Sequence, residues 1–164
     1  AQAYIFVMRG TPLMLQLFFF YFGLPITLNI TLDEFTTAVV TFVLNYAAYF
    51  AEIYRSGIQS IPAGQYEAAK VLGYTKAQTF FYVILPQVVK RVLLPMTNEI
   101  ITLIKDTALA STVAVVELMT IAKKQVSSSS SIEPYLLAIV FYLVLNGVAE
   151  QLCKLAEKKL SYYR

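Results

Sequence analysis

The sequence of 164 residues contains no histidine and a single cysteine, Cys153. One cysteine excludes a disulfide framework, and the missing histidines argue against a Cys/His metal site. A Ser-His or Cys-His nucleophile is impossible within this chain. No Gly-x-x-x-x-Gly-Lys-Ser/Thr sequence occurs, so the chain carries no phosphate-binding loop of its own. These absences make an enzyme, even one embedded in a membrane, a poor interpretation, and Cys153 is best read as a small packed apolar residue.

Charge is also scarce. Only 14% of the residues are charged, 58% are hydrophobic, and the mean hydropathy is +0.63. Soluble domains usually carry about a quarter charged residues, so this chain belongs in lipid. We predict an all-α integral membrane protein, a polytopic helical bundle forming one domain over residues 1–164. Its four membrane helices are expected near residues 12–25, 35–55, 87–105 and 134–153, because apolar stretches there approach the roughly 20 residues that cross a bilayer.

The chain starts abruptly at Ala1, without an initiator Met or a signal-peptide pattern. We therefore expect a further helix upstream of this sequence. The basic residues indicate the orientation. If Arg9 is inside, four crossings place every Lys and Arg on that side except Lys105, Lys123 and Lys124. Since such residues concentrate in cytoplasmic connections, residues 60–78 and the tail from Lys154 are predicted to be cytoplasmic.

Residues 60–78 form a polar island between apolar segments. Ser60 and Pro62 favour a helix start, and the sequence from Thr75 to Gln78 reads as a capping box that opens another helix. The residues we expect to meet a soluble partner are Gly64, Tyr66, Glu67, Ala68, Ala69, Leu72 and Gly73. The two alanines offer a small-residue face, Tyr66 and Leu72 offer apolar contacts, and Gly73 permits a turn. The residues alone leave open an ordinary amphipathic connecting loop.

Polar side chains inside the membrane segments form a second set of candidates. A carboxylate in a membrane helix is costly and is by default a functional candidate. Glu99 lies in the middle of the third segment, where Asn98 and Thr102 are near it in the helical repeat, and Asn45 and Tyr49 are four residues apart on the second segment. Facing each other, these residues would line a pocket that binds a carboxylate through Asn and Tyr and a cation through Glu99. A basic amino acid such as arginine, lysine or histidine would then be favoured.

Plainer explanations remain open for several polar residues. Asn45 is equally well explained by a hydrogen bond to a neighbouring helix. Glu52 and Arg55, three residues apart, are better explained as a structural ion pair. Lys105-Asp106-Thr107, at the outer end of its helix, is either part of an external gate, a contact for an external protein, or an interfacial cap with a locally paired Lys and Asp.

Several motifs resemble a known family. Glu67-Ala68-Ala69, followed by Gly73 and by Leu85-Pro86, resembles the EAA loop of ABC-importer permeases. Arg9-Gly10-Thr11-Pro12-Leu13 and Lys105-Asp106-Thr107-Ala108 are similar to the branch of these permeases that takes up polar amino acids. The family usually has Ser where Ala108 stands, which weakens a hydroxyl role at that position.

This resemblance implies a non-catalytic permease subunit with the type I ABC importer fold, in which residues 60–78 form a cytoplasmic coupling loop. The implied protein partners are two ABC ATPase subunits, a second permease subunit in a homo- or heterodimer, and an external amino-acid-binding protein. The other implied partners are the amino acid substrate and the lipid bilayer of a bacterial cytoplasmic membrane. No nucleic acid is implied. ATP and Mg would be bound by the ATPase and no cofactor by this chain. The competing interpretation is an ATP-independent channel or secondary transporter that uses Glu99 as an ion or proton site.

Overall fold

The computed structural model describes residues 1–160, and every regular element in this range is helical. The elements are α1 (Gln2–Gly10), α2 (Leu13–Phe18), the π-helical turn η1 (Phe19–Gly23), α3 (Leu24–Leu28), α4 (Glu34–Gln59), α5 (Ala63–Val71), α6 (Lys76–Gln78), the π-helical segment η2 (Thr79–Ile84), α7 (Leu85–Asp106), the 3-10 helix η3 (Thr107–Val113), α8 (Leu118–Ser129) and α9 (Glu133–Leu160). The all-α prediction is confirmed for these residues.

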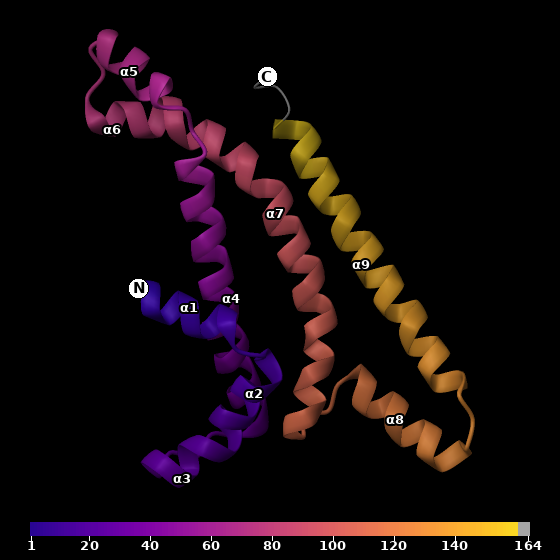
Figure 1. Ribbon diagram of the computed structural model, residues 1–164. Helices are drawn as coiled ribbons and strands as arrows, with labels where there is room; N and C mark the ends of the chain where they lie inside the picture. Colours follow the sequence, from indigo (N-terminus) through magenta and orange to yellow (C-terminus); the bar gives the residue numbers. More distant parts are fainter. Residues whose placement is uncertain (161–164) are drawn as a thin grey trace.

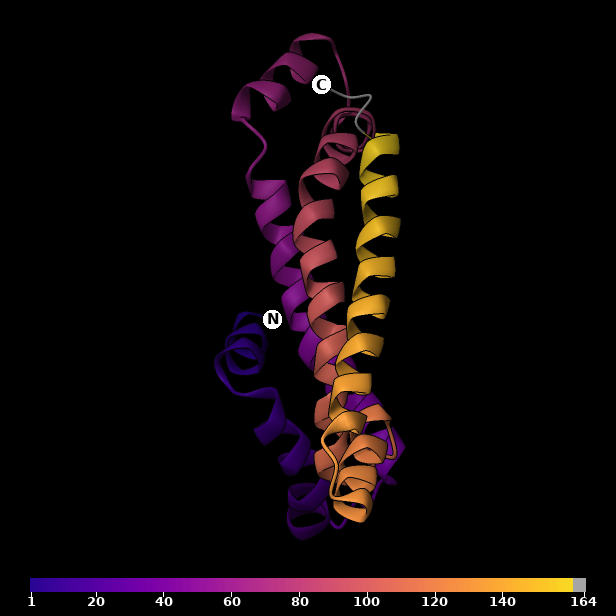
Figure 2. The same cartoon turned by 90° about the vertical axis from the view of Figure 1, so that its right-hand side faces the viewer.

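Three long helices, α4, α7 and α9, run the length of the molecule (Figure 1). Helices α5 and α6 lie at one end, together with the end of α9, while α3 and α8 lie at the other end. In the view turned by 90°, the long helices stand side by side in an elongated bundle (Figure 2). By length and composition three helical stretches can cross a membrane: Glu34–Gln59, Lys76–Val113 and Glu133–Lys159.

The first predicted segment is part of a bent pair of helices. Gln2–Gly10 and Leu13–Leu28 together pass the same test, but they meet at 104°, which makes them either a fourth, broken span or a re-entrant loop. The break lies at Thr11, with φ −117° and ψ 146°, and at Pro12, with φ −62° and ψ 134°. Proline forces the preceding residue into an extended conformation and has no N–H of its own. Pro12 therefore ends one helical direction and, as the N-cap of α2, begins another.

Leu85-Pro86 does not interrupt the helix. The helical path continues from α6 through η2 into α7, and Pro86 lies in the first turn of α7. Proline is tolerated there because its missing N–H costs little at a helix start. Residues 107–132, between the third and fourth predicted membrane segments, are mostly helical. Glu117 caps α8 by accepting hydrogen bonds of 2.6 Å from the backbone N–H groups of Met119 and Thr120.

Helices α4 and α7 cross closely at Gly57. A Cβ atom built there would lie 2.3 Å from Cγ1 of Val92, so only glycine fits. Nearby, Ile61, Ile84, Val88 and Val92 form one buried cluster. Small residues commonly permit such approaches between membrane helices. The outward face of α9, by contrast, exposes large apolar side chains along its length, as expected for a helix surrounded by lipid.

Candidate functional site

A polar cavity of about 510 Å³ lies where the break between α1 and α2 faces α4 and α7. Its lining includes Arg9, Asn45, Tyr46, Tyr49, Glu99, Thr102 and Asp106. A second cavity of about 390 Å³ shares Arg9, Tyr49 and Glu99 with the first and adds Glu52, Ser60, Arg91 and Pro95. Because they share these residues, the two cavities are adjacent. We call them together the polar path, which runs along α4 and α7 from Asp106 to Arg91.

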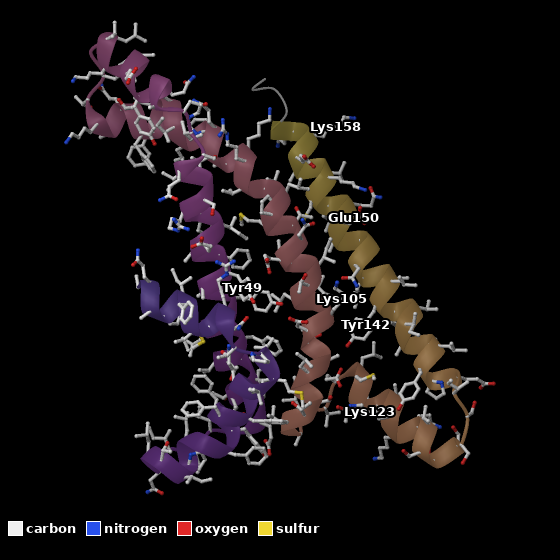
Figure 3. The ribbon with its side chains drawn as sticks, in the orientation of Figure 1. Tyr49, Lys105, Lys123, Tyr142, Glu150 and Lys158 are labelled. Atoms are coloured by element: carbon white, nitrogen blue, oxygen red, sulfur yellow. The ribbon has the colours of Figure 1, made fainter. Side chains whose placement is uncertain are left out.

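Arg9 supplies the positive charge of the polar path. Its Nη1 lies 3.7 Å from Oε1 of Glu52, and its guanidinium carbon lies 5.3 Å from the centre of the Tyr49 ring. A guanidinium at this distance from an aromatic face is attracted by the ring electrons. Figure 3 shows Tyr49 in the part of α4 that α1 crosses. The orientation argument took Arg9 as a residue of the inner side, but the 104° bend turns α1 across α4 and brings Arg9 to the path.

The Asn45 side chain holds this break together. Its Nδ2 donates to Oε1 of Gln16 at 3.0 Å and to the carbonyl of Met8 at 3.1 Å. Gln16 in turn donates from Nε2 to the carbonyl of Met8, to the carbonyl of Thr11 and to the Thr11 hydroxyl, at 2.9, 3.2 and 2.8 Å. Carbonyls at a helix end have no partner within the helix and need one in a membrane. Asn45 is thus both a lining residue and a structural clamp, and both of its amide N–H donors are used.

Sequence reasoning did not identify Gln16, although a signal was available. A buried Gln four residues after the proline that breaks a membrane helix is well placed to satisfy the carbonyls that the break releases. Arg9 had a similar signal, because it directly precedes the Gly10-Thr11-Pro12 interruption of an apolar stretch.

Glu99, Thr102 and Asp106 follow one another at intervals of three and four residues, so they share one face of α7. Asp106 is the last residue of α7, where the helix dipole disfavours a carboxylate. Its Oδ2 accepts a hydrogen bond of 2.8 Å from the hydroxyl of Tyr46, which is 5% exposed. This bond joins α4 to α7 at one end of the polar path.

Asn98 does not share this face. It lines a separate small cavity, of about 100 Å³, together with Glu150 and Lys154 of α9. Consecutive residues of an α-helix point about 100° apart, and α7 lies between α4 and α9 (Figure 1). Of the predicted pocket residues the structure therefore brings together Asn45, Tyr49, Glu99 and Thr102. The predicted ion pair of Glu52 with Arg55 is present, with Arg55 Nε 2.9 Å from Oε2 of Glu52.

The polar island forms α5 and α6 at one end of the molecule. Gly73 has φ +77°, a conformation that side chains rarely allow. The predicted capping box is present: the Thr75 N–H donates to Oε1 of Gln78 at 2.9 Å, and the Gln78 N–H donates to Oγ1 of Thr75 at 3.3 Å. Each helix start in this island is thus set by local sequence.

The predicted contact residues of α5 and the turn that follows it divide into one buried alanine and an exposed remainder. Ala69 is only 2% exposed, so it packs within the chain, where α5 lies against η2. Leu72, at the C-cap, is 72% exposed and Tyr66 is 40% exposed. Gly64, Glu67, Ala68 and Gly73 are exposed as well. All predicted contact residues except Ala69 are therefore accessible from outside.

Acidic side chains in the described residues are not grouped for metal binding. Across residues 1–160 no three or more His, Cys, Asp or Glu side chains are placed to hold an ion. The chemistry available along the polar path is therefore charge pairing and hydrogen bonding through Arg9, Glu99, Asp106 and the tyrosines.

Comparison with known proteins agrees with this geometry. Residues 1–162 match the family described as "Binding-protein-dependent transport system inner membrane component". The octopine transport system permease protein OccM of Rhizobium radiobacter is 38% identical over 166 residues, which cover 96% of this chain and 68% of OccM. The arginine transport system permease protein ArtQ of Bacillus subtilis (strain 168) is 39% identical over 161 residues, 98% of this chain and 74% of ArtQ. A solved "amino acid ABC transporter with histidines" superposes with a TM-score of 0.87 at 37% identity, covering 96% of this chain and 74% of that one.

Proposed function

Because this chain belongs to the binding-protein-dependent transport system inner membrane component family, we propose that it carries a polar amino acid, preferentially a basic one, along the polar path of an ATP-driven importer. The observation that supports this most directly is the arrangement of Arg9, Glu99 and Asp106 around one cavity. Charged groups inside a membrane protein characteristically mark substrate or ion pathways. Two of the relatives are permease proteins of an arginine and an octopine transport system, which supports a substrate of this chemistry.

The charges of the 510 Å³ cavity suggest how such a ligand would bind. One cation and two carboxylates line it. The planar guanidinium of Arg9 suits the α-carboxylate of an amino acid, since a guanidinium and a carboxylate can form two parallel hydrogen bonds. Glu99 then meets a cationic group of the ligand. A neutral zwitterion balances only one of the two lining carboxylates, whereas arginine, lysine or histidine carries an additional cation for the second. Tyr49 and Thr102 contribute hydroxyl groups beside these charges.

The second part of the proposal is the energy source. This chain has no phosphate-binding loop, so hydrolysis would take place in two ABC ATPase subunits that bind α5. Accessible Tyr66, Glu67 and Leu72 form the contact surface that we assign to them. A second permease subunit and an external amino-acid-binding protein would complete the assembly in a bacterial cytoplasmic membrane. Closure of the ATPases would then switch the polar path between its two openings.

The substrate assignment is tested by uptake into proteoliposomes that contain the whole assembly. We expect Glu99→Gln to lower the preference for L-arginine over L-glutamine by about tenfold, the factor that corresponds to roughly 1.4 kcal/mol for one lost charge pair. Glu150→Gln is the matched control, because it neutralises a carboxylate on α9 that faces away from the polar path. An unchanged preference in Glu99→Gln would overturn the proposed charge recognition.

The coupling assignment is tested separately with Glu67→Lys and Gly73→Asp. The first reverses a charge on the exposed face of α5, and the second places a side chain at φ +77°. We expect both to abolish ATP-driven uptake. Full ATP-driven uptake by both variants would refute the role of α5, and uptake by the unmodified chain without ATP would favour the channel or secondary transporter.

A further inference from the structure

One face of α7 touches both the polar path and the α5 end of the molecule. Gln87, Arg91, Pro95 and Glu99 follow at intervals of four residues, so they lie in a row along the helix. Pro95 and Glu99 line the polar path, and Arg91 marks its end. Gln87 and Arg91 also reach across to the segment that contains α5. The row thus connects two regions to which we assign different tasks.

Arg91 binds the residue at which α4 ends. Its Nη1 donates to the backbone carbonyl of Ser60 and, at 3.0 Å, to the Ser60 hydroxyl. Ser60 is the C-cap of α4, so its carbonyl is one of those without a partner inside the helix. A guanidinium at this position satisfies the carbonyl and is attracted by the negative end of the helix dipole.

The junction between α4 and α5 is fixed on its other side by apolar packing. Ile61 follows Ser60 and is 6% exposed, packed with Val88 and Val92 of α7. Pro62 comes next as the N-cap of α5. Only Ile61 and Pro62 therefore separate the Arg91 contact from the first residue of α5, so any displacement of α5 pulls on the same point of α7.

A second contact ties α5 itself to α7. Nε2 of Gln87 donates to Oε1 of Gln65 at 3.1 Å and to the carbonyl of Val83 at 2.8 Å. Gln65 lies in the first turn of α5. Arg91 and Gln87 are one helical turn apart, so α5 and the start of α7 are joined at two successive points.

Pro95 divides α7 between this joined end and the cavity. Proline has no N–H to donate to the carbonyl four residues earlier, which here belongs to Arg91. A helix that lacks one internal hydrogen bond bends most easily at that place. The Arg91 end of α7 can therefore tilt relative to the end that carries Glu99.

We propose that Arg91 is a positioning residue that transmits movement of α5 to the Glu99 face of α7, an inference that rests on the proposed role of α5 as the coupling helix. A push on α5 moves Ser60, and the guanidinium carries this movement to α7. Bending at Pro95 converts it into a change in the cavity around Glu99. Arg91 acts on the cavity around Glu99 through this movement.

The test compares Arg91→Gln, Arg91→Lys and the control Lys159→Gln, which removes one positive charge near the same end of the molecule on α9 (Figure 1). Two quantities are measured in the reconstituted assembly. The first is backbone amide exchange of residues 58–71. The second is the number of amino acid molecules taken up per ATP hydrolysed, with L-arginine, L-lysine, L-histidine and L-glutamine each tried as the probe. Exchange of residues 133–159 reports whether the variants remain folded.

We expect Arg91→Gln to raise exchange in residues 58–71 and to lower uptake per ATP by at least about threefold, while the KM for the amino acid stays unchanged. Arg91→Lys should restore part of the uptake per ATP, because the ammonium keeps the positive charge of Arg91 but lacks its fork of donors. Lys159→Gln should match the unmodified chain in both quantities.

Three results would overturn the inference. The first is unchanged amide exchange in Arg91→Gln. The second is faster exchange in Arg91→Gln with unchanged uptake per ATP. The third is a raised KM with unchanged uptake per ATP, which would make Arg91 a substrate contact. Failure of the proposed function is recognised separately, because the unmodified assembly would then take up none of the four probes. The exchange measurement still decides in that case whether Arg91 positions the α4–α5 junction.

Discussion

Replacing Gly57 by alanine should separate α4 from α7 and destabilise the protein. The new Cβ atom would lie 2.3 Å from Cγ1 of Val92, whereas ordinary contact begins at 3.4 Å. The two atoms must therefore move apart by about 1.1 Å, the difference between these distances. Valine in a helix is held in essentially one side-chain rotamer, so Val92 cannot turn away and the helices must move. Overpacking of this kind costs about 1–3 kcal/mol.

The measurement is the free energy of unfolding in mixed micelles, obtained by titration with sodium dodecyl sulfate and followed by circular dichroism. Gly147→Ala in α9 is the matched control, because its new Cβ would meet nothing within 4 Å. Alanine there should leave stability unchanged or raise it by about 0.5–1 kcal/mol, the usual difference from glycine inside a helix. The same substitution in two helices should thus have opposite effects.

A double variant makes the reasoning sharper. Val92→Ala removes the atom that clashes, so Gly57→Ala should cost much less in that background than in the unmodified chain. The coupling free energy between the two positions should amount to most of the single-variant loss. Equal losses of Gly57→Ala in both backgrounds, or a loss no larger than that of Gly147→Ala, would refute the close-contact explanation.

Three further predictions follow from hydrogen bonds in the structure. Gln16→Ala should destabilise the protein by about 1–3 kcal/mol in the same titration, since it removes the side-chain donor of the Thr11 carbonyl and one of the two donors of the Met8 carbonyl; a loss below about 0.5 kcal/mol would contradict the clamp. Tyr46→Phe should remove the hydrogen bond to Asp106 and raise solvent access to the polar path. The measurement is the rate of maleimide labelling of a cysteine placed at Thr102 in a Cys153→Ser background, which should increase. An unchanged rate would show that the Tyr46–Asp106 bond does not restrict access to the polar path. Asp33 caps α4, and hydrogen bonds from the side chain and backbone N–H of Thr36 hold the pKa of its carboxyl below the ordinary 3.8. Because the folded-state pKa is lowered, this stabilisation is present above pH 3.8 and is lost as the pH falls through the folded-state pKa. The amide protection of residues 34–37 should therefore exceed that of Asp33→Ala by less in acid than at neutral pH. A difference in protection that does not change with pH would contradict this explanation.

Local signals in the sequence predicted local structure well. The Thr75–Gln78 capping box depends on residues within one turn, and it is present. Apolar length is also a property of the sequence itself, and three helical stretches are long and apolar enough to cross a membrane.

The arrangement of the candidate site was harder to predict because it depends on directions between helices. Asn98 and Glu99 are adjacent in sequence, but the helical period of α7 points their side chains toward different neighbouring helices. Only the positions of α4 and α9 decide which of the two faces the polar path. Placing Arg9 at the site required the angle between α1 and α2 across the Pro12 break, and hydrophobic periodicity carries no information about that angle.

The spacing of Glu99 and Asp106 has a consequence for the speed of transport. Seven residues of α-helix correspond to about 10.5 Å of rise, which is too far for one ammonium or guanidinium group to touch both carboxylates at once. Each cationic group of the ligand would therefore pair with only one of the two carboxylates, and each pairing is weaker than a site formed by both acids around one cation. Pores release their ions quickly by the same division of binding among several weak positions. Selectivity for positive charge and rapid release into the cell are then compatible in one chain, because no single position holds the cargo tightly.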